Sequence, residues 1–234
     1  MDNDILRTFE TDSKSKEGNY VNFIFENPDI KPTAEFDPKL KILSIDIETS
    51  MDTKQLYSIS LVTGDGFKKA IIVSSKDWKD AISVETEKEA LLKFKDEIKR
   101  MDPDVIVGWN VIDFDFNILR TKYKKYGISF DLGRKSDDCT LRVDKDFLKD
   151  STADFKGRIL LDGIHLLKSS FIQLDDYKLG TAAKEFLGDE KLIGDDNKGA
   201  DIEDAYINNT QKLIDYNIKD SELVLQILEK TNAF

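Results

Sequence analysis

The sequence predicts an α/β domain over residues 38–234, built on a mixed sheet of five strands that is flanked by helices. Three observations predict this class. Short apolar runs alternate with longer segments in which apolar residues recur at helical spacing. Two early runs are joined by a Gly-containing turn, which is typical of a β-hairpin. Later runs are separated by helical segments, as they are in α/β domains.

Residues 1–37 are predicted to lie outside this domain, as a tail or linker. Residues 1–19 are polar and charged, and the run Val21–Phe25 is long enough for one strand. Pro28, Pro32 and Pro38 then indicate an extended linker, because proline disfavours helix at its own position and at the residue before it.

Composition limits the function classes that are open to the chain. It has 234 residues, of which 40% are hydrophobic, so it can bury a sizeable core. We find no apolar run long enough to span a bilayer and no signal peptide, so a cytoplasmic protein without a membrane partner is expected. With one cysteine and one histidine, the chain cannot form an internal disulfide or a Cys/His zinc site. Any metal must be held by oxygen.

The formal net charge of -11 argues against a protein that grips a long nucleic-acid backbone, since such binding needs clustered Lys and Arg. A site that holds only a strand end through divalent cations needs less basic surface, and a carboxylate cluster adds to the negative count. The net charge therefore does not exclude a site that holds a strand end through divalent cations.

The predicted domain opens with three strands. The first lies within residues 40–50, and the next two, 56–62 and 67–73, form the hairpin. A helix over 86–101 follows, because Thr86 and Glu89 have the spacing of a capping box and apolar residues recur after them.

The second half of the chain is predicted from shorter patterns. Residues 105–108 form a buried strand, followed by a helix that runs to Gly127, whereas 128–157 shows no sustained period. The remaining expected elements are a fifth strand at 158–162, short helical pieces at 163–170 and 178–187, a mobile Gly/Asp loop at 188–201, and a last helix at 209–230.

Three acidic constellations are candidates for chemistry. In the first strand Asp46 and Glu48 alternate with Ile45 and Ile47, so both acids leave the same face. Like charges on so apolar a strand are costly unless a cation neutralises them, although a strand end that reaches solvent would also explain them.

The second constellation follows the buried strand 105–108, where open α/β sheets bind ligands if neighbouring strands diverge. If this strand lies beside the first, Asp115 can face Asp46. Alternatively, Asp113 and Asp115 merely favour the start of a helix.

In the third constellation, Tyr216 and Asp220 are one turn apart on the inner face of the last helix. That Asp220 could also be satisfied simply by Tyr216 or by a backbone amide.

The strings SIDIETS, VGWNVIDFD and YNIKD, in this order and spacing, resemble the three motifs of the proofreading 3′–5′ exonuclease domain of family B DNA polymerases. DPDVIVGWN, GRILLDGIHLLKS and YNIKDSELV are most similar to the bacterial DNA polymerase II branch. The resemblance covers about residues 38–230. It implies a ribonuclease H-like fold, and it implies that residues 1–37 are the tail end of an N-terminal domain.

Carried over residue by residue, the resemblance implies metal-binding carboxylates at Asp46, Glu48, Asp115 and Asp220, and a catalytic tyrosine at Tyr216. It also implies contacts with the terminal nucleotides by Ile47, Thr49, Asn110 and Phe114.

The chemistry of these residues agrees with the resemblance. Ligands that are all oxygen favour Mg²⁺ or Mn²⁺, and two such ions would activate water and stabilise the leaving 3′ oxygen. Tyr216 is too weak a base at neutral pH and is expected to orient the attacking water. A ring such as Phe114 can stack on any base.

The sequence therefore predicts a 3′–5′ exonuclease that hydrolyses single-stranded or frayed DNA 3′ ends with two Mg²⁺ or Mn²⁺ ions. Proofreading for a polymerase domain in the same or a larger chain is the expected role. Two rival hypotheses are a catalytically idle scaffold domain of a polymerase and an RNA 3′–5′ exonuclease on the same fold. No polymerase motif is present in the chain.

Overall fold

The computed structural model describes residues 9–19, 21–33, 38–144, 151–188 and 198–233. The chain divides into two compact units, Met1–Leu40 and Lys41–Phe234. Within the described residues, no helix has both the length and the apolar character that crossing a membrane requires.

The first unit contains little regular structure. Its strands β1 (Phe9–Glu10) and β2 (Lys31–Pro32) form a two-residue antiparallel pair. The strand predicted at Val21–Phe25 is wrong: in this segment only Ile24 forms a β-bridge, with Lys16. The described residues of this unit supply neither a longer ladder nor a core for the run, and Phe23 remains 65% exposed.

The second unit is built on a six-stranded mixed sheet with the order β10-β7-β3-β4-β5-β6. Its strands are β3 (Ile42–Thr49), β4 (Leu56–Thr63), β5 (Lys68–Val73), β6 (Ala81–Val84), β7 (Val105–Gly108) and β10 (Ile159–Asp162). The β3–β4 and β4–β5 pairs are antiparallel, whereas β7 is parallel to both β3 and β10. The α/β class and the mixed sheet are thus confirmed.

The sixth strand, β6, is absent from the sequence prediction. It pairs parallel to β5 at the edge of the sheet, and all four of its residues are only partly buried. A short edge strand has no continuous apolar run, so it gives a weak local signal. The region 128–157, which showed no pattern, contains a second small antiparallel pair, β8 (Thr140–Arg142) with β9 (Thr152–Asp154).

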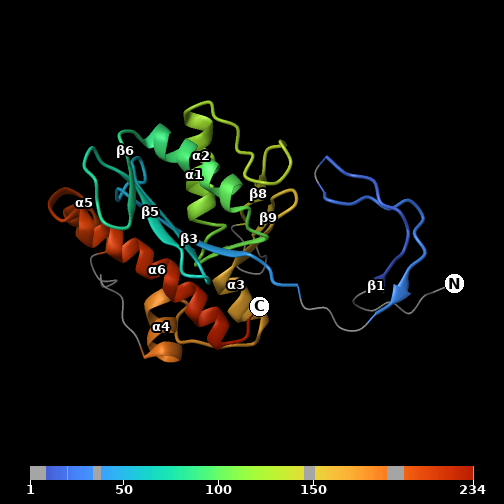
Figure 1. Ribbon diagram of the computed structural model, residues 1–234. Helices are drawn as coiled ribbons and strands as arrows, with labels where there is room; N and C mark the ends of the chain where they lie inside the picture. The colour runs from blue at the N-terminus through green and yellow to red at the C-terminus, as the bar shows by residue number, and fades with distance from the viewer. Residues whose placement is uncertain (1–8, 20, 34–37, 145–150, 189–197, 234) are drawn as a thin grey trace. The chain divides into compact units, whose positions relative to one another are not determined.

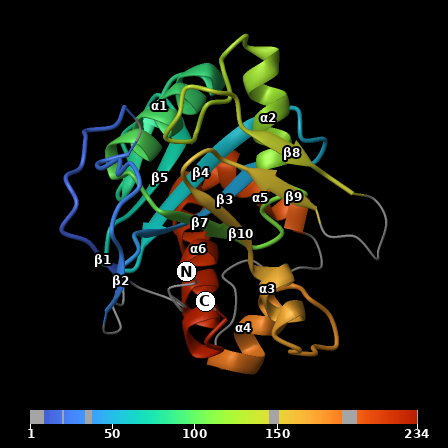
Figure 2. The same ribbon diagram turned by 90° about the vertical axis from the view of Figure 1, so that its right-hand side faces the viewer.

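Helices cover both faces of the sheet (Figures 1 and 2). One core cluster joins Ile45 and Ile47 to apolar residues of α1 and α2, and two others join the opposite face to α4, α5 and α6. The helices are α1 (Glu87–Met101), α2 (Asp115–Lys125), α3 (Gly163–Ser169), α4 (Leu179–Leu187), α5 (Lys198–Asn208) and α6 (Thr210–Lys230).

The loop predicted at 188–201 is partly wrong. Residues 198–201 form the first turn of α5, whereas residues 189–197 lie outside the described residues. The long helix α6 matches its prediction closely, since its inner face, from Leu213 to Ile227, is buried as expected.

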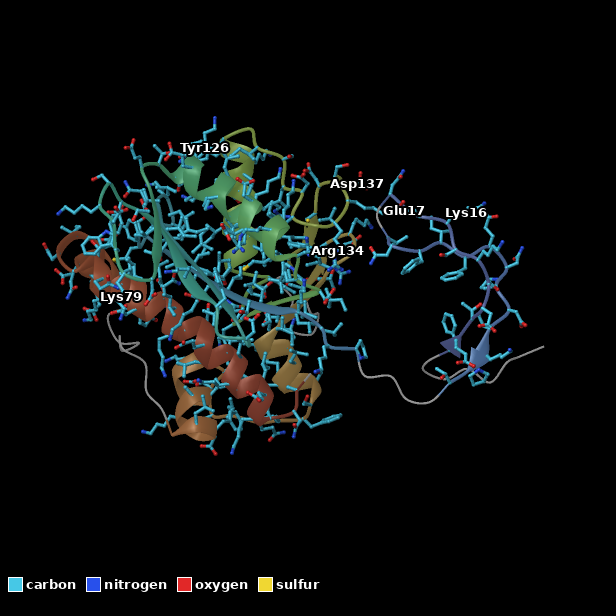
Figure 3. The ribbon with its side chains drawn as sticks, in the orientation of Figure 1. Lys16, Glu17, Lys79, Tyr126, Arg134 and Asp137 are labelled. Atoms are coloured by element: carbon cyan, nitrogen blue, oxygen red, sulfur yellow. The ribbon has the colours of Figure 1, made fainter. Side chains whose placement is uncertain are left out.

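A buried ion-pair cluster fixes the loop between β3 and β4. The Glu87 carboxylate accepts the Leu56 N–H at 2.8 Å and pairs with Lys122, whose ammonium also donates to the Lys54 carbonyl at 2.6 Å. Tyr126, which follows α2 and is labelled in Figure 3, donates to the same carboxylate. Burial raises the pKa of Glu87, but the hydrogen bonds from Lys122, Tyr126 and Lys125 outweigh burial and lower it to about 2. The end of this loop that leads into β4 is therefore held in place.

Candidate functional site

The acid pair lies on the sheet face that α6 covers. Asp46 and Glu48 stand opposite Ser60 and Ser58 of β4, whereas Ile45 and Ile47 point into the core beneath α1 and α2. Glu48 is only 3% exposed. The alternation read from the sequence places the two acids on one face because successive strand residues point to opposite sides.

A third acid joins the pair from a distant segment of the chain. Asp220 lies on the buried face of α6, and it offers a carboxylate oxygen that lies within 4.8 Å of oxygens from Asp46 and Glu48. Three carboxylates this close repel one another unless a cation lies among them. All donors in this group are oxygens, and such a set fits Mg²⁺ or Mn²⁺.

The fourth acid, Asp115, is the first residue of α2. The parallel β3–β7 ladder ends at Ser44, and beyond it the Ile47 N–H donates to the Asp115 carboxylate at 2.9 Å. Burial raises the pKa of Asp115 well above its usual range, and the charge of Asp46 adds to that effect. Asp115 thus lies against the β3 backbone between the two acids of the pair.

Tyr216 lies one turn before Asp220 and is fully buried. Burial raises the pKa of its hydroxyl, and the charges of Asp220, Glu48 and Asp46 raise it further. The phenol is therefore protonated at neutral pH and can donate a hydrogen bond.

Sequence reasoning missed one cation at this site, Lys198 at the start of α5. Its ammonium lies 3.8 Å from Glu48 Oε1 and 5.5 Å from the centroid of the Tyr216 ring. Burial lowers the pKa of Lys198, but the charges of Glu48, Asp46 and the other acids outweigh burial and raise it. The only local signal was helical spacing within 198–208, which the Gly and Asp residues before it obscured.

A cavity of about 490 Å³ opens beside the acids, where the carboxyl ends of the parallel strands β3, β7 and β10 meet. Every residue predicted for the site except Tyr216 lines it. These residues are Asp46, Ile47, Glu48, Thr49, Asn110, Phe114, Asp115 and Asp220. Phe114 is 41% exposed, so its ring is available at this cavity.

The segment 109–114, which carries Asn110 and Phe114, is held by the end of β10. The Asp162 carboxylate accepts the Ile112 N–H at 3.2 Å and, from α3, the Ile164 N–H at 3.0 Å. The Trp109 indole donates to the Tyr177 carbonyl at 2.8 Å. Gly108 is required where the segment begins, since a Cβ there would lie 2.7 Å from the Ile45 carbonyl oxygen.

The fold and the site together define a class: an α/β domain in which four carboxylates from a central strand and two helices surround a cavity at the carboxyl edge of the sheet. Residues 13–182 match the family model of the exonuclease domain of DNA polymerase family B. The chain belongs to this family, and its fold is the ribonuclease H-like fold of such exonuclease domains.

Individual relatives agree with this membership. The chain is 33% identical to DNA polymerase II of Escherichia coli over 97% of its own length and 30% of that protein. It is 29% identical to a DNA polymerase of Thermococcus gorgonarius over 67% of the chain and 20% of that protein. It is 26% identical to the DNA polymerase delta catalytic subunit of Glycine max over 64% of the chain and 15% of that protein. The chain thus spans less than a third of the length of these relatives.

Proposed function

We propose that the chain is a metal-dependent 3′–5′ exonuclease that removes nucleotides from DNA 3′ ends. The observation that carries the proposal is the convergence of Asp46, Glu48 and Asp220 within 4.8 Å, with Asp115 hydrogen-bonded to the strand between the first two. Membership of a polymerase exonuclease family supports the reaction class.

The four carboxylates would hold two Mg²⁺ or Mn²⁺ ions. Such ions, when bound, supply charge stabilisation at the scissile phosphate and make water a better nucleophile. Asp46, Glu48 and Asp220 approach from the sheet and from α6, and buried Asp115 completes the set from α2. Lys198 offsets part of the negative charge of this cluster.

Tyr216 is assigned to water orientation rather than to proton abstraction. Its raised pKa keeps the hydroxyl protonated, so it is a hydrogen-bond donor at neutral pH. Its place one turn from Asp220 puts it next to the carboxylates that define the reacting position.

The substrate end would occupy the cavity. Phe114 offers a partly exposed ring for stacking, which tolerates every base, and Asn110 offers a polar side chain next to it. Ile47 and Thr49 contribute the β3 side of the same wall. These contacts suit a single strand, because bases inside a duplex are stacked on their neighbours and offer no free face to a side chain.

Proofreading is the role that fits the relatives, which are DNA polymerases. The chain would remove misincorporated nucleotides from frayed 3′ ends that a polymerase domain, in the same or a larger chain, delivers.

A 5′-labelled single-stranded DNA oligonucleotide tests the activity in the presence of Mg²⁺ or Mn²⁺. The wild-type chain is expected to shorten the labelled strand stepwise from its 3′ end. Asp46→Ala and Asp115→Ala should each slow this about a hundredfold or more, because each removes a carboxylate of the cluster. Asp113→Ala is the matched control, since Asp113 precedes the same helix and lies outside the cavity lining.

Unchanged degradation by Asp46→Ala would contradict the proposal. A wild-type chain that binds the ion but leaves DNA intact would identify an idle scaffold. An RNA oligonucleotide of the same sequence, degraded faster than DNA, would reassign the substrate.

A further inference from the structure

Asn217 of α6 is a buried polar residue next to the acid pair that the roles assigned so far leave unexplained. It is 0% exposed. Its side-chain Nδ2 donates both to the backbone carbonyl of Asp46 at 3.1 Å and to the Asp46 carboxylate Oδ2 at 2.7 Å. One amide group therefore holds the backbone and the side chain of the same acid.

The amide is itself oriented by β4. The Ser58 hydroxyl donates to Asn217 Oδ1 at 2.8 Å, and Ser58 stands opposite Glu48 in the strand register. The reverse orientation of the amide would place its oxygen against two oxygens of Asp46, so the donor side must face the acid. A two-step chain of hydrogen bonds thus runs from Ser58 through Asn217 to Asp46.

This arrangement is costly for stability alone. An amide buried between a helix and a sheet must recover its desolvation through hydrogen bonds, whereas an apolar side chain of similar volume would pack there without that requirement. Leu213 and Val224 show that buried positions of α6 also accept apolar side chains. The amide is better explained by what it does to Asp46.

Holding Asp46 has a specific consequence for cation binding. A carboxylate whose rotamer is fixed in advance loses less entropy when it coordinates an ion, and outer partners that orient a ligand in this way raise metal affinity.

We propose that Asn217 is a positioning residue that presets the Asp46 carboxylate for a divalent cation, with Ser58 as its own orienting partner. This rests on the metal-dependent function proposed above. Asn217 touches neither substrate nor reacting atoms; it acts through Asp46.

The test is Mn²⁺ binding to the full chain, measured by calorimetry or by the electron paramagnetic resonance signal of free Mn²⁺. Asn217→Leu keeps the branched shape of the side chain and removes the amide, and it should raise the Kd for Mn²⁺ about 10- to 100-fold. Ser58→Ala should raise it by a smaller factor. Excess Mn²⁺ should restore kcat in Asn217→Leu, because affinity is lost and not the reacting groups, whereas KM for DNA should stay within twofold.

Ser221→Ala is the matched control. Ser221 lies one turn further along the same face of α6, is equally buried, and bonds to Ser60 at 2.6 Å. Ser60 in turn donates to the Asp46 backbone carbonyl at 3.2 Å, so this chain reaches the backbone of Asp46 but not its carboxylate. Its Kd for Mn²⁺ should stay within about twofold of wild type, so an equal rise in both variants would show a general structural effect and overturn the proposal.

Asp46→Asn distinguishes a failure of the positioning role from a failure of the proposed metal-dependent function. If Asp46→Asn abolishes Mn²⁺ binding while folded Asn217→Leu and Ser58→Ala bind as wild type does, the positioning role fails and the metal site stands. If the wild-type chain binds no Mn²⁺, both proposals fail. Should Asn217→Leu not fold, an unchanged Kd in folded Ser58→Ala overturns the positioning chain, and a raised Kd supports it.

Discussion

Lys198 shows how much one side chain adds to the electrostatics of the site. Its ammonium is the cation found nearest to Glu48 among the described residues, at 3.8 Å, and its own side chain is 39% exposed. A partly exposed pair contributes little alone, but here one ammonium faces several carboxylates. Its position indicates that Lys198 stabilises the carboxylate cluster most when no divalent ion is bound there.

Lys198→Met is therefore expected to destabilise the chain mainly without metal. The free energy of unfolding should fall by about 1 kcal/mol in EDTA, equivalent to a few degrees in Tm, and by less in saturating Mg²⁺. Thermal unfolding in the two buffers measures this. Lys178→Met, at the same cavity but paired with Asp176, should behave alike in both buffers. Equal losses for Lys198→Met in both would contradict the interpretation.

At the scale of elements, the β7–α2 segment 109–114 depends on a residue fifty positions away. Asp162 ends β10 and accepts N–H groups from Ile112 and from the first turn of α3. The parallel pairing of β10 with β7 brings Asp162 beside Gly108, where the segment starts. The positions of Asn110 and Phe114 thus depend on β10, the strand next to β7.

Asp162→Asn is expected to loosen this segment, because an amide can accept one of the two N–H groups but not both. Loss of one hydrogen bond of about 1 kcal/mol predicts a rise of about fivefold in KM for single-stranded DNA, with kcat within twofold. Steady-state kinetics on the labelled oligonucleotide measures both constants. Asp175→Asn, on the exposed turn before α4, is the control. A fall in kcat without a change in KM would point instead to the carboxylate cluster.

Elements with a sustained period could be read from the sequence, and elements without one could not. Helix α1 begins after its Thr86 cap, with the Glu89 N–H donating to the Thr86 hydroxyl at 3.2 Å, and β7 is buried throughout. By contrast, β6 is a short edge strand and α5 begins within a Gly/Asp-rich region. Their structure is decided by contacts with β5 and α6, which no local pattern encodes.

At the scale of the whole molecule, the fold brings together acidic side chains that lie far apart in the sequence. The formal net charge is -11, and three carboxylates converge within 4.8 Å on a largely buried surface. An ion that binds this cluster binds the folded chain far better than the unfolded one, so it must stabilise the fold.

Saturating Mg²⁺ or Mn²⁺ is accordingly expected to raise Tm relative to EDTA. An ion at a hundred times its Kd stabilises by about 2.7 kcal/mol, or about 5–10 °C for a chain of this size. Differential scanning calorimetry measures the shift, and Asp220→Asn should largely remove it. A shift of the same size in Asp220→Asn would show that the ion binds elsewhere.

The sequence by itself determined the acids and their shared strand face, because side-chain alternation in a strand is fixed by covalent geometry. It also placed Tyr216 and Asp220 on one helical face for the same kind of reason. Only the tertiary structure decided which groups surround them: Lys198 from α5, the Asn217 amide from α6, and the Ile47 N–H that Asp115 accepts. These partners lie 68 to 171 positions apart in the chain. Local patterns reach only a few residues, so contacts over such separations are set by the packing of α2, α5 and α6 on the sheet.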